Sequence, residues 1–431
     1  MKRFFSNPFH RRKSSSRTRS SSSSRRKMSS TRKSSRKISS TKKSSIRKSP
    51  KRSSKMILYD CENYQNCPKM IQPKVEKIEK NVLNTMFVGC WGVYCKKGES
   101  IERKYKKGIK TDTLVEYGGW ITSELMAVYS KQKNIDCVIL GGDNVYSTII
   151  DFIPTTKSEE NIYKIKSHDI LGQLKEGYVN CYKKIETDKF LVGIGNHDII
   201  SCDILNEQMN FNNFDKKWNL FGLSYTYTYI LDDNTKINLI FIDTNMYDEE
   251  AKYCEGTYTS EDKEQQEKWL SKVLEKNEEN WNIVIGHIPF VCNLRKCEKE
   301  KNVKDNIMDL TNNDLLILLS KFHKYIDLYM CADEHNQQYI EYKDKGVRIN
   351  QVISGTGGAP LDRELDCALK YKDKGAFIKG TQFFRSGFGF VSMDIDVDKI
   401  DLEFHIDRHD RGTYYYEKYS EPLLYTIYRK R

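Results

Sequence analysis

Four short clusters of polar residues in this chain carry side chains that commonly bind metal ions. The clusters read GGDNVY at residues 141–146, GNHD at 195–198, GHIP at 286–289 and ADEH at 332–335. The runs before them read DCVIL, FLVGI, NIVI and IDLYMC, which are short and apolar, as buried strands of an α/β sheet are. Ligand-binding groups collect at the carboxyl ends of such strands. The clusters therefore predict that carboxylate, phenol, amide and imidazole groups meet at one edge of a sheet and form a metal site.

The order and spacing of these clusters resemble those of the calcineurin-like metallophosphoesterases, and within them the purple (tartrate-resistant) acid phosphatases. The counterparts of the family's motifs are GCWG at 89–92, GDNVY at 142–146, GNHD, GHIP and ADEHNQQY at 332–339. The resemblance runs from about residue 86 to about residue 396. It implies an α/β fold, a four-layer α/β/β/α sandwich of two mixed sheets flanked by helices. It also implies hydrolysis of phosphomonoesters by a metal-activated water at a site for two ions of Fe, Zn or Mn.

The resemblance also implies a ligand set for the two ions. Asp143 is expected to bridge them, because each carboxylate oxygen can serve one cation. Tyr146 and His335 are expected on the first ion, and Asn196 and His287 on the second. Without a metal, the same residue types would serve as a turn cap, a core tyrosine or a hydrogen-bonded core histidine.

His197 is the expected catalytic residue. The resemblance places it outside the ligand set, where it would donate to a phosphate oxygen or to the leaving group. No covalent phospho-enzyme is needed, so no residue is assigned as a nucleophile.

Two ligand positions depart from the family's pattern. Cys90 stands where the family has an Asp, and Asp333 stands where it has a His. A Cys90 thiolate could replace the carboxylate and would prefer Zn or Fe(II), or the residue could be a neutral buried thiol beside a weakened site. A thiolate would also tend to reduce Fe(III), which makes a purple Fe(III) centre doubtful. Asp333 favours Mn, Mg or Fe over Zn. Glu334, between Asp333 and His335, is expected to be structural.

A third departure affects substrate binding. Lys296 falls where the family has an outer histidine, and it could clamp a phosphate or be an ordinary surface lysine. Two functions therefore stay open: a retuned metal-dependent phosphatase, or a catalytically impaired relative that acts as an interaction protein.

The first 55 residues differ in composition from the rest of the chain. They hold 21 of the 72 Lys and Arg residues, 20 Ser and no Asp or Glu, which leaves 51 basic against 59 acidic residues in the remainder. Such a tail is too polar to bury a core and is expected to be disordered. It suits nucleic-acid binding by counterion release, nuclear import or a mitochondrial presequence, and it could also be merely solubilising.

The sequence also suggests a location. No apolar stretch approaches the roughly 18–20 residues that span a bilayer, and no apolar signal region follows Met1. Twelve Cys without regular spacing suit a reducing compartment, where Cys292 and Cys297 are expected to be free thiols rather than a pair. An intracellular, non-secreted protein of the nucleus, a virion or the mitochondrion is expected.

The domain expectation is a tail at 1–55, a linker at 56–80, a metallophosphoesterase domain at 81–410 and a basic C-terminal extension at 411–431. Helices are expected at 114–133, around 170–184, from the Thr259 cap onward and at 314–325, and strands at 85–89, 136–140, 225–231, 236–243, 347–354, 388–396 and 400–406. Thr259 and Asp262 have the spacing of a capping box. Strands mixed with helices favour a sandwich of two mixed sheets flanked by helices.

Overall fold

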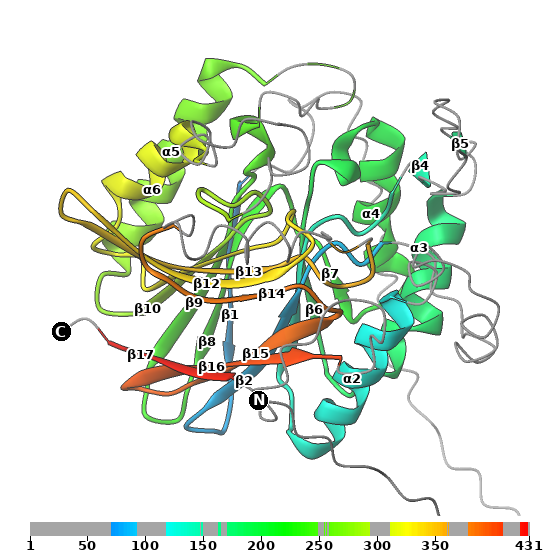
Figure 1. Cartoon of the computed structure of the whole chain (residues 1–431), viewed down its shortest axis with the longest axis horizontal. Helices are drawn as coiled ribbons and strands as arrows, with labels where there is room; N and C mark the ends of the chain where they lie inside the picture. Colours follow the sequence, from blue (N-terminus) through cyan, green and yellow to red (C-terminus); the bar gives the residue numbers. More distant parts are fainter. Residues whose placement is uncertain are drawn as a thin grey trace, which may run out of the picture. The chain divides into compact units, whose positions relative to one another are not determined.

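The computed structural model describes the parts of the chain that carry the fold. These are residues 70–92, 118–146, 148–149, 163–164, 170–248, 254, 256, 258–293, 311–359, 361, 378–407 and 423–429. All of them fall in one compact unit, Met56–Arg431 (Figure 1).

One sheet has seven strands in the order β17-β16-β15-β2-β3-β6-β7. They are β2 (Leu83–Val88), β3 (Cys137–Gly141), β6 (Phe190–Gly193), β7 (Trp218–Asn219), β15 (Gly389–Ile395), β16 (Lys399–Ile406) and β17 (Leu423–Tyr428). The strands from β2 to β7 run parallel, whereas β15, β16 and β17 add an antiparallel part. The sheet is therefore mixed, as expected.

The second sheet has eight strands in the order β1-β8-β9-β10-β11-β13-β12-β14. They are β1 (Met70–Lys77), β8 (Ser224–Ile230), β9 (Lys236–Phe241), β10 (Trp281–Ile285), β11 (Leu328–Cys331), β12 (Gln337–Asp344), β13 (Val347–Ser354) and β14 (Thr381–Arg385). Its centre, β9-β10-β11-β13, is parallel. A short ribbon pairs β4 (Thr148–Ile149) with β5 (Tyr163–Lys164).

Helices cover the outer face of each sheet, so the unit has four layers (Figure 1). They are α2 (Gly118–Gln132), α3 (Ile170–Asn180), α4 (Cys202–Phe214), α5 (Ser260–Lys276) and α6 (Asn313–Lys321), with 3-10 turns η4 (Tyr182–Lys184), η5 (His197–Ile199) and η6 (Asn245–Tyr247). The helices α2, α3 and α4 pack on the seven-stranded sheet, and α5 and α6 pack on the eight-stranded sheet.

The apolar runs are continuous because each central strand is buried on both faces. Along β10, Ile283 and Ile285 enter the core between the sheets, while Val284 enters the core under α5 and α6. The expected α/β/β/α sandwich of two mixed sheets is confirmed.

Local signals placed several elements well. The capping box at the start of α5 is present, with Thr259 accepting from the backbone of Asp262 and Asp262 accepting from the backbone of Thr259. The expected hairpin is β8–β9, which pairs antiparallel. Helix α6 ends at Lys321, four residues before the expected end.

Other elements appear where the sequence indicated none. Strand β1 lies within the expected linker and pairs parallel with β8, and β17 lies within the expected C-terminal extension and pairs with β16. Both are edge strands; the partner of β1 is distant in sequence, whereas β17 pairs with the strand that precedes it in the chain. Helix α4 begins after a cap in which the Ser201 side chain accepts from Ile204 N–H.

The cysteines differ from expectation in one respect. Cys202 and Cys254 form a disulfide, whereas Cys292 is a free buried thiol, as expected. The disulfide gives no support to the expected reducing compartment, and the location stays a prediction.

Within the part of the chain that the structure describes, none of the helices has the length and apolar character needed to cross a membrane.

Candidate metal centre

The carboxyl ends of strands from both sheets supply the candidate ligands. Cys90 follows β2, and Asp143 follows β3, in the seven-stranded sheet. His287 follows β10, and Asp333 follows β11, in the eight-stranded sheet. Each residue comes within two positions of the end of its strand, so the position of the strand in the sheet sets the position of the ligand.

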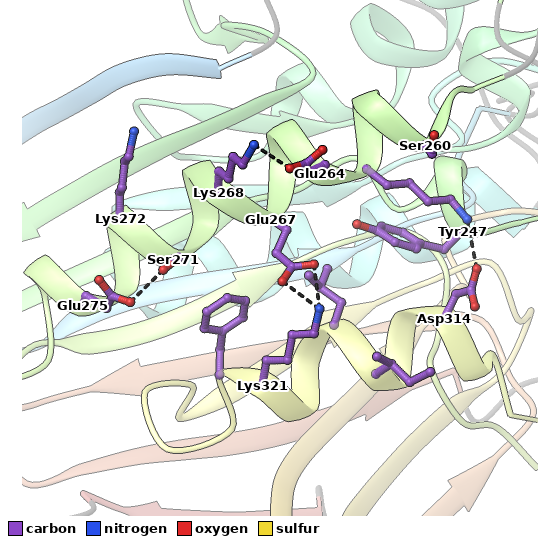
Figure 2. Close-up of a pocket in the computed structure, with 14 residues that line it drawn as sticks. Tyr247, Ser260, Glu264, Glu267, Lys268, Ser271, Lys272, Glu275, Asp314 and Lys321 are labelled. Carbon is purple, nitrogen blue, oxygen red and sulfur yellow. Dashed lines mark hydrogen bonds and ion pairs between the residues drawn. The ribbon is translucent and has the colours of Figure 1, made fainter.

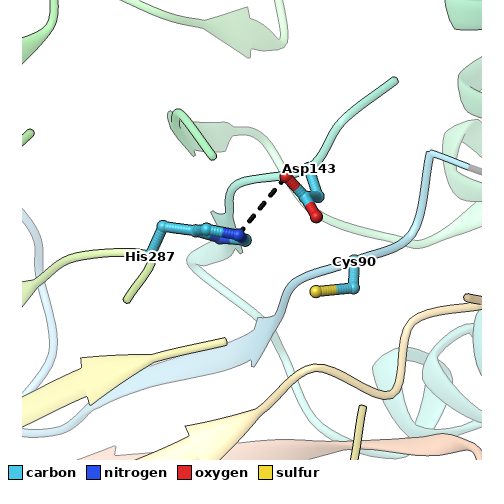
Figure 3. Close-up of side chains that lie close together, drawn as sticks. All are labelled: Cys90, Asp143 and His287. Carbon is cyan, nitrogen blue, oxygen red and sulfur yellow. Dashed lines mark ion pairs between the residues drawn. The ribbon is translucent and has the colours of Figure 1, made fainter. Parts of the chain in front are cut away.

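Three of these side chains form a tight group. The ligating atoms of Cys90, Asp143 and His287 all lie within 4.8 Å of one another, and all three residues are buried (Figure 3). His287 Nε2 lies 3.3 Å from Asp143 Oδ1 and 3.7 Å from Asp333 Oδ1. The structure thus brings Asp333, the residue that replaces a family histidine, to the rim of the same group.

The orientation of the His287 ring suits a metal ligand. Its Nδ1 lies 2.8 Å from the Gly141 carbonyl oxygen, which can only accept, so Nδ1 carries the proton. In the neutral ring Nε2 then presents a lone pair to the Asp143 carboxylate, and two acceptors at this distance need a cation between them. Burial opposes the charged imidazolium, but Asp143 and Asp333 more than offset it and raise the pKa of His287 to about 9. A proton or a metal ion must fill this position.

Four residues of the candidate site have buried polar atoms that lack hydrogen-bond partners. Tyr146 Oη, Asn196 Oδ1, His197 Nδ1 and His287 Nε2 are buried and accept or donate no hydrogen bond within the described part of the chain. Buried polar atoms are normally satisfied, so four unsatisfied atoms in one constellation need an explanation. Bound metal ions would satisfy the atoms of Tyr146, Asn196 and His287, and these donors are ones that metal ions accept.

The acidic protons of the group are held tightly. Burial, followed by the charges of Asp143 and Asp333, raises the pKa of the Cys90 thiol well above its usual value. Burial, followed by Asp143 and Cys90, likewise raises the pKa of the Tyr146 phenol. A metal ion would therefore have to displace two protons to gain both as anionic ligands.

The backbone at three ligand positions is left-handed. Cys90, Asp143 and Asp333 have φ of 55°, 54° and 59°. Asp visits this region more readily than most residues, whereas Cys does not, so the family's Asp suits position 90 better. Gly195 leaves room for the Asp143 carboxylate, since a Cβ there would lie 2.3 Å from Asp143 Oδ1. Strain of this kind gathers at functional sites.

His197 lies beside the group. Its backbone N–H donates to Asp143 Oδ1 over 3.2 Å, and its ring packs against the Tyr146 ring with centroids 4.4 Å apart. His335 lies two residues after Asp333 on the β11–β12 loop, is half-buried and is not a member of the tight group. Glu334 is buried, and Lys296 lies outside the described residues.

Sequence reasoning missed the residue that joins two of the ligand loops. The Asp198 carboxylate accepts N–H groups from Asn144 (2.8 Å) and Val145 (3.1 Å) after β3, and from Gly195 (2.7 Å) after β6. The sequence did offer a signal for Asp198, because it is the last residue of the GNHD cluster. A second missed group, Asp243-Thr244-Asn245, follows the apolar strand β9 and has the same pattern as the recognised clusters.

A groove of about 900 Å³ between α5 and α6 is a separate feature (Figure 2). None of the candidate ligands lines it. Three of its lysines form ion pairs with neighbouring carboxylates, as in Lys263–Asp314 and Lys321–Glu267. Most of its charge is therefore neutralised within the groove, which offers no site comparable to the metal centre.

Comparison with known proteins places the chain in a family. The family model for the calcineurin-like phosphoesterases matches residues 85–337, more than half of the chain, so the protein belongs to this family. By class it is a metallophosphoesterase, a hydrolase family whose members hold two-metal centres. No curated protein matches the sequence.

Solved structures share the fold at low identity. GAP50, the anchor in the inner membrane complex of Plasmodium, is 15% identical, with 82% of this chain and 90% of that chain covered and a TM-score of 0.50. The purple acid phosphatase PPD1 from yellow lupin (Lupinus luteus) seeds is 15% identical over 81% of this chain and 54% of its own, with a TM-score of 0.46. PhoD is 13% identical over 76% of this chain and 66% of its own, also with a TM-score of 0.46.

Proposed function

We propose that the protein hydrolyses phosphomonoesters at a two-metal centre built from the residues above. The observation that carries the proposal is the buried His287–Asp143 pair, whose facing atoms lie 3.3 Å apart and need a proton or a metal ion between them. The unpartnered atoms of Tyr146 and Asn196 support it, because they offer further oxygen ligands from the neighbouring loops.

Each candidate ligand has a place in the proposed two-metal centre. Asp143 would serve both ions, with Tyr146, His335 and Cys90 as ligands for the first ion and Asn196, His287 and Asp333 as ligands for the second. Two bound ions would supply the positive charge that a phosphate ester and an attacking water need. The ions are Fe, Zn or Mn, since thiolate and imidazole suit Zn or Fe and the carboxylates suit Mn.

His197 supplies the proton in this proposal. Its backbone N–H donates to Asp143, while its Nδ1 has no hydrogen-bond partner in the described part of the chain, so the ring lies beside the candidate ligands and can serve a substrate. It donates to the leaving alkoxide oxygen, and Lys296, if it lies near the phosphate, adds a positive charge. An acid optimum, as in the purple acid phosphatases, belongs to the same proposal.

The test measures metal content and hydrolysis together. Purified, metal-replete protein should contain two ions per chain by mass spectrometry and should release nitrophenol from p-nitrophenyl phosphate. Asp143→Asn should lose both properties, whereas Asp232→Asn, in the exposed β8–β9 turn, should keep them. Protein without bound metal, or hydrolysis that survives Asp143→Asn, would contradict the proposal.

A second function rests on the two altered ligands. Burial keeps the pKa of the Cys90 thiol high, so a neutral thiol and an empty first position would leave a catalytically impaired interaction protein. The fold does occur in a protein described as an anchor in the inner membrane complex of Plasmodium. In this alternative the basic residues 1–55 bind nucleic acid, within an intracellular location such as the nucleus, a virion or the mitochondrion.

A further inference from the structure

We propose that Thr244 is the positioning residue that fixes His287 in the metal centre and thereby sets the affinity for the ion that His287 binds. This inference rests on the proposed function only in taking the centre to bind metal. Thr244 is fully buried in the loop after β9, a strand that neighbours β10.

The Thr244 hydroxyl holds the backbone of the ligand loop. Its Oγ1 accepts the N–H of His287 and the N–H of Ile288, each over 2.9 Å. Both donors sit in the loop that leaves β10, where no strand partner satisfies them. One oxygen therefore fixes two consecutive peptide units, including the one that carries the imidazole.

A local capping role does not explain this hydroxyl. Thr244 occupies the N-cap position of η6, yet its side chain accepts no N–H of that turn. Asp243 does so instead, because its Oδ1 accepts the N–H of Asn245 over 3.0 Å. The bonds that Thr244 accepts from His287 and Ile288 point across to the β10 loop, 43 and 44 residues away in sequence.

Helix α5 restrains Thr244 through the preceding residue, Asp243. The buried Gln266 amide binds both backbone groups of Asp243: its Oε1 accepts the N–H and its Nε2 donates to the carbonyl, each over 2.9 Å. Ser224 Oγ donates to the same Oε1 over 2.7 Å. The residue before Thr244 is thus fixed by β8 and α5 together, so the hydroxyl has little freedom to follow a moving histidine loop.

The packing at Gly286 completes the restraint. A Cβ on Gly286 would lie 2.5 Å from Thr244 Cγ2 and 2.5 Å from Tyr329 Oη. Both side chains therefore pack closely against the backbone of the loop at this glycine. Tyr329 Oη donates to the Ile288 carbonyl. With the main chain held by Thr244 and the ring held by the Gly141 carbonyl, Nε2 of His287 points at the Asp143 and Asp333 carboxylates.

The test separates positioning from mere stability. Metal-free wild type, Thr244→Val and Thr244→Ser are each titrated with Zn²⁺ alone and with Mn²⁺ alone, and melting is recorded with and without metal. Thr244→Val keeps the shape and loses the acceptor, so the dissociation constant should rise by about ten- to a hundredfold, the range for residues that orient ligands. Thr244→Ser keeps the hydroxyl and should stay within about threefold of wild type.

Thr226→Val is the matched control. Thr226 lies buried on β8, and its hydroxyl has no hydrogen-bond partner among the residues that the structure describes, so the same substitution should leave metal affinity unchanged. A purely structural role would lower the melting temperature of Thr244→Val while the dissociation constant equals that of wild type, and this result would overturn the inference.

A wild-type measurement covers the case in which Thr244→Val does not fold. The amide protons of His287 and Ile288 should be protected from hydrogen exchange in the metal-free protein, and rapid exchange of both would also overturn the inference. Weakened metal binding in a chain that never hydrolyses p-nitrophenyl phosphate would uphold the role of Thr244 and overturn the proposed activity. Hydrolysis of p-nitrophenyl phosphate, with equal metal affinities in wild type and Thr244→Val, would uphold the proposed activity and overturn the role of Thr244.

Discussion

His287 Nε2 and Asp143 Oδ1 face each other at 3.3 Å although they come from strands of two different sheets. The Gly141 carbonyl holds the ring proton on Nδ1, so the facing atoms are both acceptors unless a proton or metal ion lies between them. This contact joins the two sheets at the candidate centre, and metal binding should therefore affect the stability of the whole unit.

Metal removal should destabilise the protein. At free metal about 100 times the dissociation constant, binding to the folded state alone adds ~2.7 kcal/mol, so chelation should lower the melting temperature. Asp143→Asn should melt at one temperature with or without Zn²⁺ or Mn²⁺. Calorimetry with and without chelator checks this, and equal melting of wild type in both conditions would argue against a metal centre.

Cys90→Asp should raise a weak phosphatase activity. The left-handed backbone at position 90 suits Asp, and a carboxylate is ionised more readily than this buried thiol. We expect kcat/KM to rise by about tenfold or more, equivalent to ~1.4 kcal/mol of transition-state stabilisation. Cys90→Ser removes the thiol without supplying a carboxylate and should give no gain. A loss of activity with Zn²⁺ in Cys90→Asp would instead identify Cys90 as a working thiolate ligand.

Asp333→His should also raise the activity, and its effect should depend on whether Cys90→Asp is present. It restores the family's imidazole at a residue that lies 3.7 Å from His287, next to the group that contains Cys90. In the proposed two-ion centre both substitutions would act on one bridged pair of ions, so the double variant should differ from the sum of the single effects. Kinetics of the four proteins with the same metal measure the coupling, and strict additivity would show that positions 90 and 333 act independently.

Deleting residues 1–55 should remove nucleic-acid binding and leave the fold intact. The segment carries 21 positive charges and no negative one, so its binding should weaken steeply as salt rises. Gel-shift titrations of full-length and truncated protein at low and high salt test this, with circular dichroism to compare their folds. Equal binding of DNA or RNA by the two proteins at low salt would refute it.

His405 should make stability fall at acid pH. Its ring stacks on Phe390 at 4.4 Å, and burial, with the charge of Lys133, lowers its pKa to about 4 from an ordinary 6.5. The folded state therefore prefers the neutral ring. The stability it contributes is complete above about pH 6.5 and is lost as pH falls towards 4, by up to ~3 kcal/mol.

The variants His405→Phe and His405→Gln test whether His405 makes stability fall as the pH falls. Neither side chain titrates, and Gln keeps a polar partner for Ser392, whose hydroxyl lies 2.9 Å from His405 Nε2. Urea unfolding across this pH range should show a smaller loss of stability in both variants than in wild type. Parallel curves for all three proteins would mean that His405 does not titrate differently in the folded state.

The sequence by itself determined the elements and residues whose signals are local. An apolar run followed at once by a polar cluster marks a buried strand and its end, and this located Asp143, His287 and Asp333 correctly at strand ends. The capping box of α5 was readable for the same reason, since Thr259 and Asp262 contact each other within one turn. The family's fold followed from the order of such clusters.

Only the tertiary structure decided which of these groups meet and what holds them. Thr244 and His287 are 43 residues apart, Asp198 and Asn144 are 54 apart, and Cys202 and Cys254 are 52 apart, so no local pattern announces their contacts. The edge strands β1 and β17 likewise depend on partners elsewhere in the chain. Strand order in the two sheets brings these segments together, and strand order arises from packing across the whole core rather than from any one segment's sequence.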